Sequence, residues 1–212
     1  MKKVLEIFLL LALLSCGYLN AMAQEVTIIG ENNDSSNFYG GATELKPESK
    51  IKVDGNYTIS LNENGAKCFS RDDDLSGNWI GYLTSKEDGS SSVSVFRPVG
   101  THTVLRVHIN LINRSKQETN WLKRVKCDVV YDDRYVFETM PVQYNPDQKD
   151  DNDYVGYASI EARPAEPLVS MHIGFFVSVP YIVRDSDKPL YAYITVDDDV
   201  YTVNLRDLMV IG

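Results

Sequence analysis

The three histidines are the residues best suited to metal binding or acid–base chemistry, so their spacing decides whether they can act together. His102 and His108 lie six residues apart on the polar side of one predicted strand, which separates them by roughly 20 Å. One metal ion cannot bind both. His172 falls on the polar face of another predicted strand, and a pair of histidines without a third ligand makes a poor site. We therefore predict surface histidines and no resident metal.

Three clusters of aspartates offer the hard oxygen ligands that calcium prefers. They lie at residues 72–74, at residues 147–153 (Asp147, Asp150, Asp151 and Asp153) and at residues 197–199. None has the EF-hand spacing, with glycine at the sixth place and glutamate at the twelfth. We interpret the clusters as solvated turns. A calcium-braced loop from Asp147 to Asp153 is the one alternative left open.

Nucleophilic catalysis has little support in this chain. No Gly-x-Ser-x-Gly motif is present, and each histidine is assigned to a strand surface instead of a position beside a serine or cysteine. Paired carboxylates suited to glycoside cleavage could come from any of the 30 acidic residues, so the sequence selects none. We predict no catalytic residue and no cofactor. The alternative is an extracytoplasmic hydrolase whose carboxylate site the sequence does not reveal.

Cys68 and Cys127 are the two cysteines outside the N-terminal leader described below. Cys127 falls on the inward side of a predicted strand, and an exported domain favours disulfides. A bridge between the two would stabilise the fold by roughly 4 kcal/mol in the chain-entropy model. The alternative is a pair of buried thiols that act as small apolar residues. Neither cysteine has a near partner, so a CxxC redox or zinc motif is excluded.

Tyrosines predict a contact surface, because this side chain combines large apolar area with a hydroxyl at low entropic cost. Those in or beside predicted loops, or on the polar side of a strand, are Tyr144, Tyr154, Tyr157, Tyr191 and Tyr193. The alternative is structural tyrosine at sheet edges. The leading hypothesis is a non-enzymatic module that binds a protein or cell-envelope partner.

Residues 1–23 have the composition of an export signal. Lys2 and Lys3 are followed by an apolar run over residues 7–14, and Ala21 and Ala23 form a small-x-small cleavage motif before Gln24. The apolar run is too short for a transmembrane span, and no later segment reaches the roughly 20 apolar residues required. The sequence thus predicts a secreted or periplasmic protein.

A second interpretation of the leader involves Cys16. Residues 13–16, Leu-Leu-Ser-Cys, resemble a bacterial lipobox, in which the cysteine is acylated and becomes the mature N-terminus. Cleavage after Ala23 is the preferred prediction, and a membrane-anchored lipoprotein stays the alternative.

The mature chain is acidic. Removal of the leader takes away Lys2, Lys3 and Glu6 and changes the formal net charge from −9 to −10. Nucleic acids and anionic lipid surfaces attract clustered Lys and Arg, so both are excluded as partners on electrostatic grounds. The polar, glycine-containing composition of residues 24–48 predicts an N-terminal arm or linker, and residues 49–212 suffice for one domain.

Period-two hydrophobicity predicts an all-β fold for that domain. Apolar residues alternate with polar ones over residues 103–111, 125–131 and 171–179, and Pro180 ends the last of these strands. A hairpin is predicted from Leu190 through a turn at 197–199 to Leu205, and Gln24 to Ile29 predicts a short strand. No segment has a sustained helical period. Short strands separated by turns indicate two antiparallel sheets packed face to face, an immunoglobulin-like β-sandwich.

Four motifs in order resemble a broad family of bacterial exported immunoglobulin-like domains of unknown function. They are the strand and Asn-x-Ser-Lys turn at residues 103–116, the charged hairpin at 131–135, the Pro-Leu pair at 167–168 and the strand at 175–180. The resemblance extends from Ser49 to Asp207. It implies a β-sandwich at the cell exterior and transfers no catalytic residue.

The chain departs from that family at two places. Leu168 stands where the family has glycine after the proline, and residues 147–153 form an unusually acidic loop.

The position of the cut is testable on the exported protein. Because Ala21 and Ala23 satisfy the small-residue requirement of signal peptidase, intact-mass measurement is expected to find Gln24 as the first residue. A diacylated or triacylated Cys16 would instead establish the lipoprotein.

Overall fold

The fold is centred on two long antiparallel strands, β7 (His102–Asn113) and β12 (Ser170–Pro180). In this computed structural model, Leu105, Ile109 and Ile173 are fully buried on their inward side. The alternation predicted for both strands is confirmed, and β12 ends at Pro180 as expected. The structure describes residues 26–28, 39–68, 80–85, 91–96, 100–144, 158–159 and 164–211.

Sheet B, the larger sheet, has nine strands among the described residues. Their order is β15-β4-β7-β12-β10-β11-β5-β6, and β3 pairs with residues 57–60 of β4. The β4–β15 and β5–β11 pairs are parallel, and the other pairs are antiparallel. The remaining strands are β3 (Lys50–Val53), β4 (Tyr57–Cys68), β5 (Ile80–Ser85), β6 (Ser91–Phe96), β10 (Met140–Tyr144), β11 (Ala158–Ser159) and β15 (Met209–Ile211).

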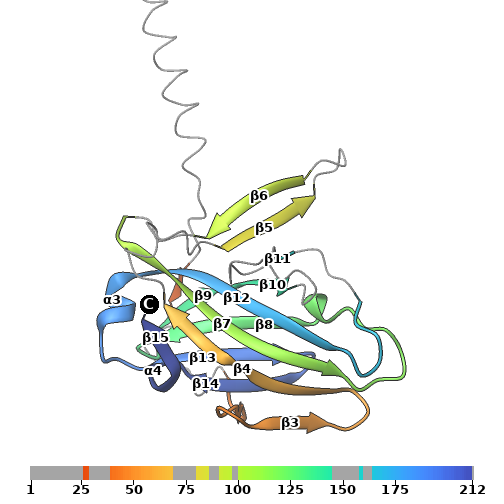
Figure 1. Cartoon of the computed structure of the whole chain (residues 1–212). Helices are drawn as coiled ribbons and strands as arrows, with labels where there is room; N and C mark the ends of the chain where they lie inside the picture. Colours follow the sequence, from red (N-terminus) through yellow and green to blue (C-terminus); the bar gives the residue numbers. More distant parts are fainter. Residues whose placement is uncertain are drawn as a thin grey trace, which may run out of the picture.

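Sheet A lies behind sheet B in Figure 1 and has the described strand order β1-β9-β8-β13-β14-β2. Its strands are β1 (Val26–Ile28), β2 (Thr43–Glu44), β8 (Val125–Tyr131), β9 (Tyr135–Glu138), β13 (Leu190–Val196) and β14 (Asp199–Asn204). The predicted C-terminal hairpin is therefore confirmed. Helical structure in the described chain is confined to η2 (Trp121–Lys123), α3 (Tyr181–Asp185) and α4 (Leu205–Leu208).

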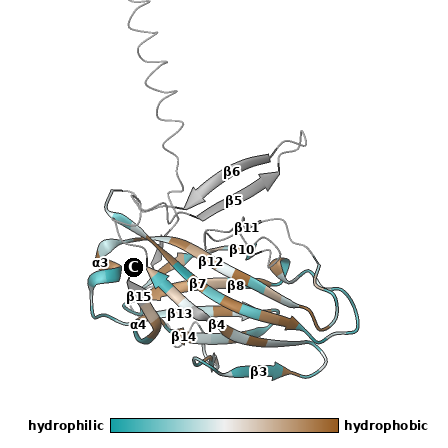
Figure 2. Ribbon diagram, viewed as in Figure 1, coloured by the Kyte–Doolittle hydropathy of each residue, from teal (hydrophilic) through white to brown (hydrophobic). Residues whose placement is uncertain are grey.

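The hydrophobic core fills the space between the two sheets. Apolar residues recur along the strands, as the brown bands show (Figure 2). Sheet B contributes Leu105, Ile109 and Phe175, and sheet A contributes Val129 and Ile194, all fully buried. At roughly 25 cal/mol per Å² of apolar area, this burial is the dominant force that holds the sheets together. The prediction of an all-β sandwich is confirmed.

Two segments of the predicted arm are strands of sheet A. β1 pairs with β9 at one edge of the sheet, which confirms the short strand expected near residue 26. β2 pairs with β14 at the opposite edge, over Thr43 and Glu44 only. These pairings cover backbone N–H and C=O groups that an edge strand otherwise leaves exposed. Composition alone does not reveal such pairing, because polar strands and polar linkers look alike.

The Asn-x-Ser-Lys turn is organised by the buried side chain of Asn113. Its Nδ2 donates to the carbonyls of Gln117 and Ala165, both at 2.8 Å. Its Oδ1 accepts from the backbone N–H of Ser115 at 2.9 Å and from the Ser115 hydroxyl at 2.8 Å. The amide is satisfied on both sides, which favours one conformation for the connection after β7.

Leu168 has a positive φ of 68°, in the left-handed region that favours glycine. Glycine would adopt this backbone conformation without a steric penalty, whereas leucine adopts it at a cost. The Leu168 N–H donates to the carbonyl of Asn113 at 2.7 Å, which holds the turn despite its strain. The side chain itself is 69% exposed and adds little packing.

Leu168→Gly is expected to raise the free energy of unfolding by about 0.5–1 kcal/mol. Relief of roughly 1–2 kcal/mol of left-handed strain outweighs the added flexibility of glycine in the unfolded chain. Urea unfolding of the two proteins measures the difference. Val169→Gly is the control, since Val169 is exposed and has no positive φ, and it should lower stability. Equal loss in both variants would contradict the strain argument.

Candidate interaction surface

An aromatic and apolar cluster covers part of the outer face of sheet A, away from the core. Strand pleating places Val130 of β8 and Tyr191 and Tyr193 of β13 on this face, with Val200 of β14 beside them. Tyr193 is directly opposite Asp128 on one neighbouring strand and Thr202 on the other. The rings of Tyr191 and Tyr193 have centroids 6.3 Å apart.

Tyr39, from the segment before β2, packs onto this cluster. Its ring is stacked on Tyr193 with centroids 4.0 Å apart and planes 9° from parallel. Its hydroxyl donates to Asp128 Oδ2 at 2.9 Å. We call Tyr39, Tyr191, Tyr193 and Val200 the sheet A tyrosine surface.

The environment of the Tyr39–Asp128 pair fixes which group carries the proton. Burial raises the pKa of Tyr39, and the nearby Asp128 carboxylate raises it further. Burial also raises the pKa of Asp128, while the hydrogen bond from Tyr39 opposes that rise. The raised pKa keeps Tyr39 a neutral phenol that donates to Asp128. Deprotonation of Tyr39 therefore does not readily break this contact.

The structure divides the predicted tyrosine surface. Tyr191 and Tyr193 lie together, but Tyr193 is only 8% exposed because Tyr39 covers it. Tyr144 pairs with His172 in sheet B, on the other layer of the sandwich. Tyr154 and Tyr157 lie outside the described residues.

Sequence reasoning missed Tyr39. It lies 89 residues before Asp128, and its surroundings have loop composition. An aromatic residue directly before Gly40 and Gly41 in a polar segment was the available signal.

The prediction that all three histidines lie on the surface is wrong for His108. Burial, with Arg106 and His172 nearby, lowers its pKa to about 3, so the imidazole is neutral at pH 7. Its ring centroid lies 6.1 Å from that of His172 on the outer face of sheet B. Within the described ranges, no three His, Cys, Asp or Glu residues are grouped so that they could hold a metal ion.

The predicted disulfide is wrong in this structure, where Cys68 and Cys127 are both free and buried. Cys68 pairs with Leu105 in sheet B, whereas Cys127 pairs with Ile194 in sheet A. The two thiols thus sit on different layers as small apolar core residues, which was the alternative. Burial raises the pKa of Cys68 to about 11, so it stays a thiol.

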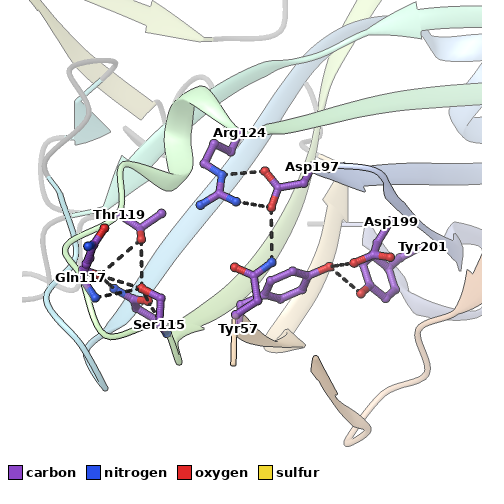
Figure 3. A network of polar contacts seen from close by, with 10 residues as sticks. Tyr57, Ser115, Gln117, Thr119, Arg124, Asp197, Asp199 and Tyr201 are labelled. Atoms are coloured by element: carbon purple, nitrogen blue, oxygen red, sulfur yellow. Dashed lines mark hydrogen bonds and ion pairs between the residues drawn. The ribbon is translucent and has the colours of Figure 1, made fainter. Parts of the chain in front are cut away.

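Two aspartates of the acidic turn at residues 197–199 form hydrogen bonds with other parts of the protein, so the turn is not simply solvated. Asp197 accepts two hydrogen bonds from Arg124, at 2.6 Å from Nε and 2.5 Å from Nη2 (Figure 3). Asn56 Nδ2, in the β3–β4 turn, donates to the same carboxylate at 3.5 Å. The guanidinium of Arg124 also lies 4.7 Å from the ring centroid of Trp121.

The neighbouring Asp199 accepts a 2.6 Å hydrogen bond from Tyr57 Oη. That hydroxyl also lies 2.7 Å from Tyr201 Oη (Figure 3). Because Tyr57 is in sheet B and both partners are in sheet A, the contact links the layers. These carboxylates have structural partners and are poor candidates for calcium ligands. Residues 72–74 and 147–153 lie outside the described residues.

Comparison with known proteins supports the fold and no more. No protein family model matches the chain, and no curated protein matches it. Its structure is similar to that of an uncharacterized β-sandwich protein from Clostridium difficile 630, with a TM-score of 0.54 and 20% sequence identity. The match covers 77% of this chain and 94% of the other.

Across the described residues, no helix has the length and apolar character needed to cross a membrane.

Tyr39→Phe is expected to lower the free energy of unfolding by about 0.5–1.5 kcal/mol, because Asp128 loses a hydrogen bond while the ring stack stays. Urea unfolding at pH 7 measures it. Tyr191→Phe is the matched control on the same face, since its hydroxyl forms no hydrogen bond with the described residues. Equal changes in the two variants would contradict the assigned role of the Tyr39 hydroxyl.

Proposed function

We propose that this chain is an exported, non-enzymatic immunoglobulin-like module that binds a protein or cell-envelope partner through the sheet A tyrosine surface. The leader-like composition of residues 1–23 supports export. The β-sandwich supports a module of this class, since such sandwiches present outer sheet faces and loops to partners.

The observation that carries the proposal is the aromatic cluster on a face that the core does not use. Tyr39 and Tyr191 are half-buried, and Val200 beside them is partly exposed. Tyrosine is enriched in protein interfaces because its ring buries apolar area and its hydroxyl accepts or donates hydrogen bonds.

The stacked arrangement also reduces the entropic cost of binding. Tyr39 is held by both a ring stack and a hydrogen bond, so its side chain is already ordered before a partner arrives. The net charge of −10 expected for the mature chain favours a neutral or basic partner surface over an acidic one.

Capture from the cell-envelope fraction of the source organism tests the proposal. The exported protein, with a photo-crosslinking amino acid at position 191, is expected to form an adduct with a specific partner. In capture without the crosslinking amino acid, the double variant Tyr191→Ser, Val200→Ser should retain at least tenfold less partner than the unsubstituted protein. Both side chains are lost from the contact.

Ile182→Ser is the matched control, because Ile182 is an exposed apolar residue on α3, outside the cluster. It should leave capture unchanged. Equal capture by all three proteins, or no adduct from position 191, would count against this surface.

A further inference from the structure

The turn that leads into β12 carries an exposed leucine in a strained backbone conformation. The Val169 N–H donates to the carbonyl of Glu166 at 3.1 Å, which closes a turn over residues 166–169. Pro167 is the second residue of this turn, and Leu168 at the third position has a φ of 68°. That combination matches a type II turn, in which the third position favours glycine. We call residues 166–169 the Leu168 turn.

The exposure of Leu168 adds to the cost of its backbone. Its side chain is 69% exposed, and that of Val169 beside it is 45% exposed. An exposed leucine by itself needs no explanation, since single apolar residues are common on protein surfaces. A leucine that is also left-handed is different, because neither its backbone nor its side chain then stabilises the folded chain. Strained residues cluster at functional sites.

The body of the sandwich holds this turn in place. The Leu168 N–H donates to the carbonyl of Asn113 at 2.7 Å, and the Asn113 N–H donates to the carbonyl of Val169 at 3.1 Å. Directly before the turn, Ala165 forms a backbone bridge with Thr119. The Ala165 carbonyl also accepts from the buried side chain of Asn113 at 2.8 Å. Leu168 is thus presented from an ordered backbone, which reduces the entropic cost of binding.

The charge of the Leu168 turn distinguishes a protein partner from a lipid surface. Glu166 is exposed and forms no ion pair with the described residues. Arg114, which follows Asn113, donates through Nε to Thr58 of β4 at 3.0 Å. The turn itself is therefore an apolar tip with one carboxylate, on a mature chain with an expected net charge of −10. Both charges oppose insertion into an anionic bilayer and favour a basic protein surface.

We propose that Leu168 inserts into an apolar pocket of a protein partner, with a basic group of that partner beside Glu166. Val169 contributes the edge of the same contact. Burial in the pocket gains the free energy that an exposed leucine does not contribute in the isolated chain. The Leu168 turn precedes a strand of sheet B, so this contact is separate from the sheet A tyrosine surface and each can fail alone.

Photo-crosslinking of the exported protein tests the contact. Benzoylphenylalanine at position 169, which has no positive φ, leaves Leu168 in place. In cells of the source organism it is expected to form an adduct with one protein, which mass spectrometry identifies. The same amino acid at position 182 is the control, because Ile182 is 68% exposed and follows the other end of β12. No adduct from position 169, or the same adducts from both positions, overturns the proposal.

The affinity of the purified pair then assigns the role of Leu168. Leu168→Gly is expected to stabilise the chain and yet to weaken binding at least tenfold, because the buried leucine is lost. Leu168→Asn should weaken binding equally, since asparagine tolerates the left-handed backbone but is polar. Leu168→Met keeps the apolar volume and should change affinity several-fold at most. Full affinity in both the glycine and the asparagine variants would refute the contact.

Two measurements test the expected chemistry of the partner. Glu166→Gln should weaken binding at low ionic strength and have little effect at high salt; no effect at low salt contradicts the basic group. Vesicles of phosphatidylethanolamine and phosphatidylglycerol should not sediment the exported protein. Sedimentation that Leu168→Asn abolishes would assign the turn to a membrane and overturn the protein contact.

Discussion

The hydroxyl of Tyr57 lies fully inside the protein and must find partners there, and it finds them on the other sheet. It donates to Asp199 and lies 2.7 Å from the hydroxyl of Tyr201. The Tyr57 ring meets Trp121 edge-on, with centroids 5.3 Å apart. Apolar burial alone is not directional, so this polar contact helps to set how the two layers align at their shared end. The Arg124–Asp197 pair reinforces the same end.

The strands were predictable because their information is local. β7, β12 and β13 were each predicted from apolar residues that recur two apart in the sequence. The contacts that position the surfaces are long-range. Tyr39 reaches Asp128 across 89 residues and Arg124 reaches Asp197 across 73, and no periodicity encodes either pairing. The disulfide was mispredicted for the same reason, since an inward phase does not bring two cysteines within bonding distance of each other.

Sheet B also shows why period two underestimates burial. Phe175 faces the core, yet Phe176, its neighbour on the opposite face, is fully buried as well. Val104 and Val142 are likewise buried on that second face. Arg106 lies on this second face. Its polar character correctly predicts the outer side of the strand, but it does not predict that the side chain is buried there. Partial burial of His108 has the same cause.

The two outer faces differ in how one buried polar group is satisfied. On sheet A, the partly buried Asp128 carboxylate accepts a hydrogen bond from the neutral hydroxyl of Tyr39. The chain itself thus offsets the cost of burying this carboxylate. On sheet B, the buried Nε of Arg106 has no hydrogen-bond partner. A hydrogen-bonded pair such as Tyr39 and Asp128 holds its surface in one arrangement, which suits recognition by shape. The sandwich core can hold both faces because its stability comes from the apolar layer between them.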